Sequence, residues 1–211
     1  TCATCDGAFF RDEDMLVVGG GDAAMEEANF LTKFADTVYL AHRRDEFRAE
    51  DYWIDRIHEQ VAEDNVEIMK NTELLAVEGS PEDGVEYVTL AQNESGHPAE
   101  NLDAAETEEI ECDVGAVFLA IGHTPNTQYL EGTGVTLDDT GYIETVGTSG
   151  EGQTKTDVDG LFAAGDVVDH YYQQAITAGG MGGKAAIDAD EYLHDLSRAD
   201  NEAVETAEAD D

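Results

Sequence analysis

Residues 15–24 read Met-Leu-Val-Val-Gly-Gly-Gly-Asp-Ala-Ala, and this stretch decides the fold. The run of apolar residues predicts a short buried strand, and the glycines after it predict a tight turn. Residues 22–34 then carry apolar side chains at helical spacing, and a second apolar run follows at 38–41. Strand, glycine turn, helix and strand in this order form the βαβ unit of a doubly wound, Rossmann-like α/β fold.

The glycine turn fits the pattern Gly-x-Gly-x-x-Ala at Gly19, Gly21 and Ala24. In a dinucleotide site the first glycine permits the tight turn, the second admits the pyrophosphate, and the small third residue lets the helix pack on the strand. The helix N-terminus at Asp22 offers partial positive charge to the phosphates. A plain turn is the alternative, and the flanking strand and helix favour cofactor binding.

The second strand ends in His42, Arg43 and Arg44, and Arg48 lies one helical turn further on. A site for NAD typically has an acidic residue here, which binds the ribose hydroxyls. In this chain, half of the six arginines fall in that short window. A surface charge run is the alternative, but clustered cations in so acidic a chain favour a bound anion. The cluster predicts the 2′-phosphate of NADPH.

The remaining sequence alternates apolar runs with polar turns, and it suggests a domain at 1–120 followed by a shorter section at 121–198. Residues 92–109 are polar and carry Pro98, so we expect a solvated hairpin or loop there. The alanine-rich acidic stretch at 199–211 predicts a disordered tail. The other expected elements are helices over 48–61 and about 174–196, and strands at 66–69, 74–77, 85–91 and 116–121.

Acidic residues dominate the composition, with 49 Asp and Glu against 10 Lys and Arg and a net charge of -39. Such a surface repels nucleic acids and anionic membranes. The regular apolar runs indicate a folded chain rather than a disordered one. Because concentrated salt screens repulsion among carboxylates, we expect an organism adapted to high salt. Since no apolar run reaches membrane-spanning length, we expect the chain in the cytoplasm.

The cysteines are Cys2, Cys5 and Cys112, and the first two form a Cys-x-x-Cys pair. In a reducing compartment such a pair indicates redox chemistry or a zinc site. Zinc needs two further ligands, and no histidine pairs with Cys112 at a suitable spacing, so no metal site is expected. Asp6 follows Cys5 directly. It can carry a proton during thiol–disulfide exchange, or it can cap a helix or turn, and the sequence leaves both roles open.

Together these motifs resemble the low-molecular-weight thioredoxin reductases, which are flavin-dependent pyridine nucleotide-disulfide oxidoreductases. The resemblance implies that NADPH reduces FAD, that FAD reduces the Cys2–Cys5 disulfide, and that the dithiol reduces thioredoxin. Cys2 would attack thioredoxin, Cys5 would face the flavin, and Asp6 would handle the proton. The segments that carry the resemblance are Cys-Ala-Thr-Cys-Asp-Gly at 2–7, Gly-Gly-Gly at 19–21, His-Arg-Arg-Asp-x-Phe-Arg-Ala-Glu at 42–50, Ala-Ile-Gly-His-x-Pro-Asn-Thr at 120–127, and Gly-x-Phe-Ala-Ala-Gly-Asp-Val at 160–167.

The resemblance also implies FAD contacts in the last third of the chain. Gly165 and Asp166 would hold the ribityl and phosphate side, although a simple strand-to-turn exit is the alternative. The helix start at Gln174 and Ala175 would lie near the pyrimidine end of the flavin, where a helix N-terminus favours negative charge. Gln173 departs from the family, since an arginine is expected at its position.

Gly122 and His123 would form one strand of a hinge on which the NADP domain rotates. Family members begin with a separate FAD-binding βαβ unit, and this sequence starts at Thr1, after the place of that unit. We therefore expect a fragment in which 121–198 belongs to an FAD-binding domain and which is inactive alone. The resemblance further suggests a homodimer. A related flavoprotein serving another disulfide partner and a stand-alone NADP-binding redox switch are the alternatives.

Overall fold

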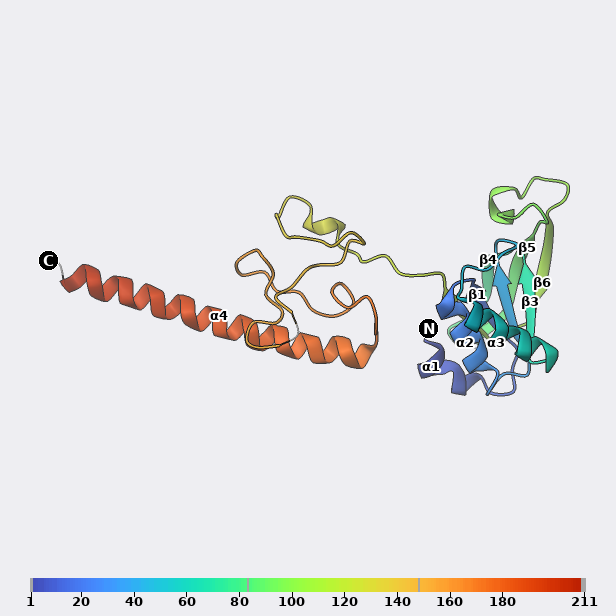
Figure 1. Cartoon of the computed structure of the whole chain (residues 1–211), viewed down its shortest axis with the longest axis horizontal. Helices are drawn as coiled ribbons and strands as arrows, with labels where there is room; N and C mark the ends of the chain where they lie inside the picture. The colour runs from blue at the N-terminus through green and yellow to red at the C-terminus, as the bar shows by residue number, and fades with distance from the viewer. Residues whose placement is uncertain (1, 83, 148, 210–211) are drawn as a thin grey trace. The chain divides into compact units, whose positions relative to one another are not determined.

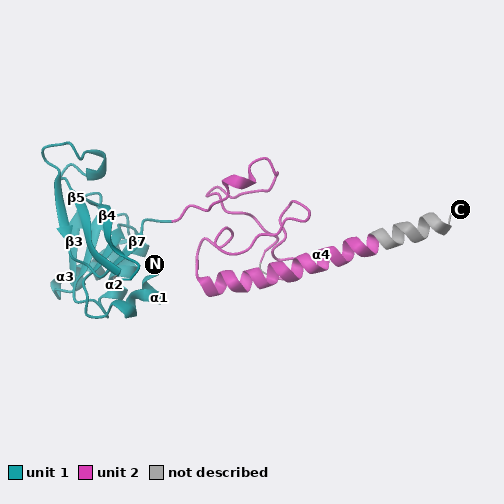
Figure 2. Cartoon of the chain, turned by 180° about the vertical axis from the view of Figure 1, so that it is seen from behind, with its two compact units in different colours: residues 1–122 teal, residues 123–211 magenta. Residues whose placement is uncertain are grey.

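The computed structural model describes residues 2–82, 84–147 and 149–209. By internal contacts the chain divides into two compact units, Thr1–Gly122 and His123–Asp211 (Figure 2). We refer to them as unit 1 and unit 2. The division falls between the two residues for which the sequence predicts a hinge. Within the described residues, no helix is both long and apolar enough to cross a membrane.

Unit 1 contains the predicted βαβ unit, and its α/β fold confirms the sequence-based prediction. A parallel sheet has the strand order β3-β2-β1-β7. Figure 1 labels two of its strands, β1 and β3, together with the helices α2 and α3. Met15 in β1 pairs with Val38 in β2 and with Ala116 in β7, so the strands begin at one level. The elements are β1 (Met15–Gly19), α2 (Asp22–Leu31), β2 (Val38–His42), α3 (Asp51–Ala62), β3 (Val66–Lys70) and β7 (Ala116–Ala120).

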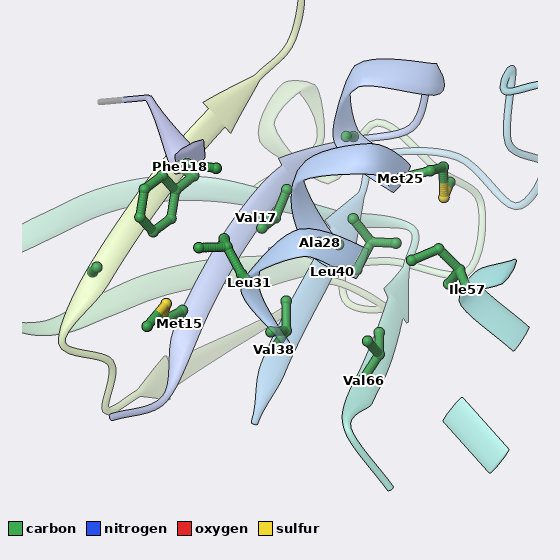
Figure 3. Close-up of a cluster of buried hydrophobic side chains, with 13 residues drawn as sticks. Met15, Val17, Met25, Ala28, Leu31, Val38, Leu40, Ile57, Val66 and Phe118 are labelled. Carbon is green, nitrogen blue, oxygen red and sulfur yellow. The ribbon is translucent and has the colours of Figure 1, made fainter. Parts of the chain in front are cut away.

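The parallel sheet is buried on both faces. Successive side chains of a strand point to opposite sides, so each strand contributes to a core cluster on either face. Met15 and Val17 face the side of the sheet that α2 and α3 cover. Phe118 of β7 and Leu31 of α2 belong to the same core cluster (Figure 3). Leu16, between the first two, belongs to a second cluster on the other face. That cluster also contains Val88 and Leu90 of β5 and the partly buried Leu74 of β4, so helices cover one face and an antiparallel sheet covers the other.

The antiparallel sheet has the order β4-β5-β6 and corrects one expectation. Its strands are β4 (Thr72–Ser80), β5 (Gly84–Gln92) and β6 (Glu108–Cys112). The sequence predicts a solvated segment at 92–109 and no strand between it and the one expected at 116–121. β6 carries three glutamates, yet Ile110 and Cys112 alternate with them and face Leu90 and Val88 of β5. Two inward side chains in an otherwise charged pentapeptide are too weak a pattern to predict a strand.

The segment between β2 and α3 is longer than predicted, because α3 begins at Asp51 rather than at Arg48. The N–H group of Glu50, directly before the helix, donates to the carboxylate of Asp22 at 2.7 Å. Near the N-terminus, α1 (Ala3–Asp6) is a single turn that continues into the 3₁₀ helix η1 (Gly7–Phe10). Cys5 lies in α1, and Cys2 is the N-cap residue directly before it.

Unit 2 has a small core and extensive irregular chain. Among its described residues, β-structure is limited to the bridges Leu137–Ile143 and Lys155–Phe162, and the buried apolar cluster comprises Leu130, Ile143 and Ala163. η3 (Gln128–Leu130) and α4 (Ala175–Ala209) are its helices.

α4 differs from the helix and tail that the sequence predicts. The helix continues through residues 199–209, where we expect disorder. Alanine and glutamate, which dominate this stretch, have high helix propensity, and that propensity accounts for the difference. Asp210 and Asp211, the end of the predicted tail, lie outside the described residues.

Candidate functional site

A cavity of about 710 Å³ opens at the carboxyl ends of β1, β2 and β7 in unit 1. In doubly wound sheets this edge is where ligands bind. The walls are the glycine turn after β1 (residues 19–21), the start of β4, the end of β7 and the segment after β2 (residues 43–48), which we name the arginine segment. The predicted site residues that line the cavity are Gly19, Gly21, Asp22, His42, Arg43, Arg44, Arg48 and Gly122.

Each of the three glycines in the glycine turn has different surroundings in the direction of a Cβ atom. Gly19 has φ 156°, and a Cβ atom there would overlap the Ala120 carbonyl oxygen and lie 2.8 Å from the Ala24 methyl group. At Gly20 a Cβ atom would overlap the imidazole of His42. Gly21 has open space around its Cβ direction, which leaves room for a ligand at the start of α2.

Ala24 is fully buried and packs beneath Gly19, so it acts through helix packing rather than by lining the cavity. This matches the role that the small third residue of the motif has in dinucleotide sites. Gly20 was not among the predicted site residues. The pattern Gly-x-Gly-x-x-Ala leaves the position of Gly20 unspecified. Glycine is required there because any side chain would overlap His42 at the end of β2.

His42 is buried against the glycine turn, with 7% of its surface exposed. Its Nε2 atom lies 3.0 Å from the carbonyl oxygen of Glu46, to which it donates in the neutral tautomer. Phe47 packs on the ring at a centroid distance of 5.2 Å. Burial lowers the pKa of His42, and the positive charges of the neighbouring arginines lower it further. His42 therefore supports the turn as a neutral side chain.

The arginine segment is tied to the glycine turn through backbone groups. The N–H group of Arg48 donates to the carbonyl oxygen of Gly20 at 2.7 Å. Asp22, predicted as a cofactor residue, accepts a hydrogen bond from Glu50 and so joins the start of α2 to the start of α3. Within residues 2–82, 84–147 and 149–209, the guanidinium groups of Arg43, Arg44 and Arg48 form no ion pair within 4.0 Å. They are available to an anionic ligand at the cavity.

The predicted dithiol lies on α1 with its sulfur atoms in contact. Cys5 Sγ donates a hydrogen bond to Cys2 Sγ at 2.7 Å, and the Cys5 N–H donates to the same sulfur at 3.3 Å. The bond to Cys2 raises the pKa of the Cys5 thiol. Cys2 Sγ therefore accepts two hydrogen bonds from Cys5. A short sulfur–sulfur approach is also what disulfide formation needs.

Asp6 accepts a hydrogen bond from the Cys2 N–H at 3.1 Å, which fixes the first residue of the pair to the end of the helical turn. This contact favours the capping role that the sequence left open, and proton transfer by Asp6 stays a prediction. Phe9, three residues further on, is 80% exposed. The signal for it in the sequence is weak, because a single aromatic residue four positions after Cys5 forms no pattern.

The predicted FAD residues all lie in unit 2, and His123 is its exposed first residue. Gly165 has φ 82°, and its carbonyl oxygen accepts hydrogen bonds from Val168 and Asp169, so it forms a turn beside the exposed Asp166. The turn geometry is compatible with both alternatives that the sequence left open there.

The segment before α4 is held by side chains. Gln173 has φ 46° and donates from its amide to the hydroxyl of Tyr142 at 3.0 Å. Gln174 immediately precedes the helix, which begins at Ala175, and the first N–H groups of a helix have no partners within it. These residues are therefore placed at the helix start that the sequence predicts.

Cys112 lies apart from the pair, in β6, where burial raises the pKa of its thiol. In the described part of the chain no cluster of three His, Cys, Asp or Glu side chains could hold a metal ion. The cysteine pair on α1 does not belong to the cavity lining, so the structure brings together the predicted NADP residues but not the complete set.

Comparisons with known proteins show the family. Residues 1–182 match the Pyridine nucleotide-disulphide oxidoreductase family. A thioredoxin reductase from Mycolicibacterium smegmatis is 49% identical over 193 residues, which cover 92% of this chain and 55% of that protein. A protein named glucosaminate ammonia-lyase from Pseudomonas fluorescens is 44% identical over 198 residues, which cover 94% of this chain and 57% of that protein.

Among solved structures, thioredoxin reductase from Streptococcus pyogenes MGAS5005 matches with a TM-score of 0.71 at 34% identity. The match covers 92% of this chain and 56% of that one. The chain therefore spans little more than half the length of the relatives it matches.

Proposed function

The chain belongs to the pyridine nucleotide-disulphide oxidoreductase family, and from this premise we propose that it is the NADPH-binding and dithiol-carrying part of a thioredoxin reductase. One observation carries the proposal. The same unit holds a cysteine pair with its sulfurs 2.7 Å apart and a nucleotide-sized cavity lined by a glycine turn and arginines. A lyase has no evident use for such a dithiol, so the name of the Pseudomonas relative does not direct the assignment.

The proposed reaction moves two electrons from NADPH to a protein disulfide. NADPH gives up a hydride and becomes NADP⁺, and with one proton from solvent the Cys2–Cys5 disulfide becomes two thiols. FAD, when bound, relays the two electrons between the nucleotide and the disulfide. The dithiol then attacks thioredoxin through Cys2, Cys5 closes the disulfide again, and thioredoxin leaves with two thiols.

The arginine segment supports a preference for NADPH over NADH. Arg43, Arg44 and Arg48 line the cavity, and a guanidinium group can bind a phosphate through two parallel hydrogen bonds. Replacing Arg43 and Arg44 with alanine should remove contacts that contribute about 1.5–3 kcal/mol each. The measurement is calorimetric titration of the 211-residue chain with 2′,5′-ADP and with 5′-AMP, which differ by the 2′-phosphate.

Arg56→Ala is the matched control, because Arg56 pairs on the surface of α3 with Glu59 and does not line the cavity. The unmutated chain and this control should both prefer 2′,5′-ADP, and the double variant should bind the two ligands alike. An unmutated chain that does not distinguish them would refute the assignment of the arginines to NADPH.

The dithiol assignment is tested by alkylation of the reduced chain with iodoacetamide. Cys2 should react before Cys5, because the hydrogen bond to Cys2 raises the pKa of the Cys5 thiol. Cys112, whose thiol pKa burial raises, should react last and serves as the internal control. In the longer enzyme, Cys5→Ser should leave flavin reduction by NADPH intact and abolish thioredoxin turnover. Sustained turnover in that variant would refute the scheme.

FAD contacts are proposed for Gly165, Asp166, Gln174 and Ala175 in unit 2, with Gln173 beside them. The turn at Gly165 and the start of α4 have backbone geometry that can face a ribityl chain and a ring edge. Because the matched relatives are nearly twice as long, we propose that tight FAD binding and activity require sequence beyond these 211 residues. Rotation about Gly122 and His123 remains part of the proposal.

Thioredoxin is the proposed partner, and the exposed Phe9 beside the dithiol supports a protein substrate, since exposed aromatic side chains are common in interfaces. We further propose a homodimer in the cytoplasm of an organism adapted to high salt. The net charge of -39 supports the salt requirement. The melting temperature should rise steeply between about 0.1 M and about 1 M KCl, as screening shortens the range of repulsion.

A further inference from the structure

Residues 93–97, which we name the support loop, lie behind the arginine segment and hold its backbone. The N–H group of His97 donates to the carbonyl oxygen of Arg43 at 3.0 Å. The N–H group of Asn71 donates to the carbonyl oxygen of Arg44 at 3.3 Å. Gly96 has φ 76°, and a Cβ atom there would lie 3.4 Å from the Arg43 oxygen, so the loop runs close against this backbone.

Asn93 holds the support loop and Asn71 together. Its backbone N–H donates to the carbonyl oxygen of Asn71 at 3.0 Å, and its own carbonyl oxygen accepts from Gly96 at 2.8 Å. Its side-chain oxygen accepts from the N–H of Ser95 at 2.8 Å, and its side-chain amide donates to the Thr107 hydroxyl at 2.8 Å. The residue is only 4% exposed, so solvent cannot readily replace these bonds.

Asn93 does not line the nucleotide cavity. It lies on the wall of a separate polar cavity of about 480 Å³, together with Asn71 and Ser95. The hydrogen bonds of the support loop and Asn71 give Asn93 a route to the cavity through the backbone of Arg43 and Arg44. The glycine turn is held by other contacts, through Arg48 and His42, so it does not depend on Asn93.

We propose that Asn93 is a positioning residue that sets selectivity for the 2′-phosphate from outside the cavity, which rests on the proposed use of NADPH. An arginine binds phosphate strongly only when its planar group is correctly placed, so a displaced backbone weakens the contact. Loss of the Asn93 side chain removes its bonds to the Thr107 hydroxyl and the Ser95 N–H, which frees the support loop and with it the His97 anchor of the Arg43 carbonyl oxygen. The pyrophosphate and the rest of the nucleotide, bound at the glycine turn, are unaffected.

Asn93→Ala tests the proposal in the 211-residue chain at one fixed salt concentration. Calorimetry should show 2′,5′-ADP binding about tenfold more weakly, which corresponds to about 1.4 kcal/mol, while 5′-AMP binding stays within about twofold. Ser95→Ala is the control, because it keeps the backbone N–H that Asn93 uses and should change neither affinity. A merely structural role of Asn93 would weaken both ligands together, and that result overturns the proposal.

Thr107→Val covers the possibility that Asn93→Ala does not fold. It removes the acceptor of the Asn93 amide while leaving Asn93 itself in place, and it should lower selectivity in the same direction by a smaller factor. Failure of the proposed function is distinguishable, because the unmutated chain would then bind 2′,5′-ADP and 5′-AMP alike. If the unmutated chain is selective and both variants keep its full selectivity, the inference about Asn93 is wrong.

Discussion

Unit 1 and unit 2 are stabilised in different ways. In unit 1, buried apolar clusters lie on both faces of a parallel sheet, and side chains such as Phe118, Met15 and Leu16 are fully buried. In unit 2 the described apolar cluster is small and contains the buried residues Leu130, Ile143 and Ala163. Burial of apolar side chains therefore contributes more to the stability of unit 1 than to that of unit 2.

Carboxylates hold unit 2 where apolar contacts do not. Asp188 on α4 accepts hydrogen bonds from the N–H groups of Gly152 and Thr154 and from the Thr154 hydroxyl. Asp138 accepts hydrogen bonds from Thr140 and from the N–H group of Tyr142, and it thereby holds the turn at residues 138–142. In a chain this acidic, aspartates that are hydrogen-bonded to the backbone serve as structural residues. The comparison shows that the acidic composition has a structural use in addition to its effect on the surface.

The largest expected effect is in the core of unit 1. Phe118→Ala should destabilise that unit by about 3–5 kcal/mol, because the side chain is fully buried and contacts the edge of Phe10 at a centroid distance of 6.4 Å. Denaturant unfolding followed by the fluorescence of Trp53 reports on unit 1 alone, since it is the single tryptophan. Leu119→Ala, on the same strand but 52% exposed, is the control.

Amide exchange in unit 2 should be unchanged in Phe118→Ala if the two units are stabilised separately. A parallel loss of protection at residues 150–156 would contradict the contrast drawn between them.

A smaller effect is expected at the carboxylate of unit 2. Asp188→Asn places an amide against the Thr154 donors and should cost about 1–3 kcal/mol. Exchange at residues 150–156, measured by mass spectrometry, should accelerate while the Trp53 transition stays unchanged. Asp190→Asn is the control, since Asp190 is an exposed residue of α4 that pairs with His194 at 3.7 Å. Equal exchange in both variants would show that Asp188 does not hold the loop to α4.

The same carboxylate gives unit 2 a pH dependence. The Thr154 hydroxyl, followed by the Thr154 N–H, lowers the pKa of Asp188. The unfolded chain then binds a proton more readily than the folded one, so the stabilisation is complete above the ordinary pKa of about 4 and is lost as the pH falls through the lowered value. Asp188→Asn should remove this component of acid destabilisation.

The smallest expected effect concerns His42 in unit 1. Burial lowers its pKa from the ordinary value of 6.5, so the unfolded form again binds the proton more readily. Stabilisation is present above pH 6.5 and declines as the pH falls through the lowered pKa. Between pH 7 and pH 5 the Trp53 transition should shift more in the unmutated chain than in His42→Asn. His58→Asn, at an exposed position of α3, should keep the full shift.

The sequence predicts the parts of unit 1 that depend on local pattern. The βαβ unit follows from the apolar runs and the glycine turn, and the structure confirms it. β6 was missed because only Ile110 and Cys112 signal it among glutamates. Gly20 and Asn93 could not be found in this way, because their importance comes from contacts with His42 and with Asn71, which lie far away in the sequence.

The hydrogen bond between Arg48 and Gly20 has a consequence for protein engineering. Since the backbone N–H of Arg48 makes this bond, the identity of the side chain at position 48 is separable from the integrity of the turn. A library that varies this side chain to change cofactor choice should therefore yield mostly folded variants. Proline is the exception, because it lacks the N–H and would detach the arginine segment from the glycine turn.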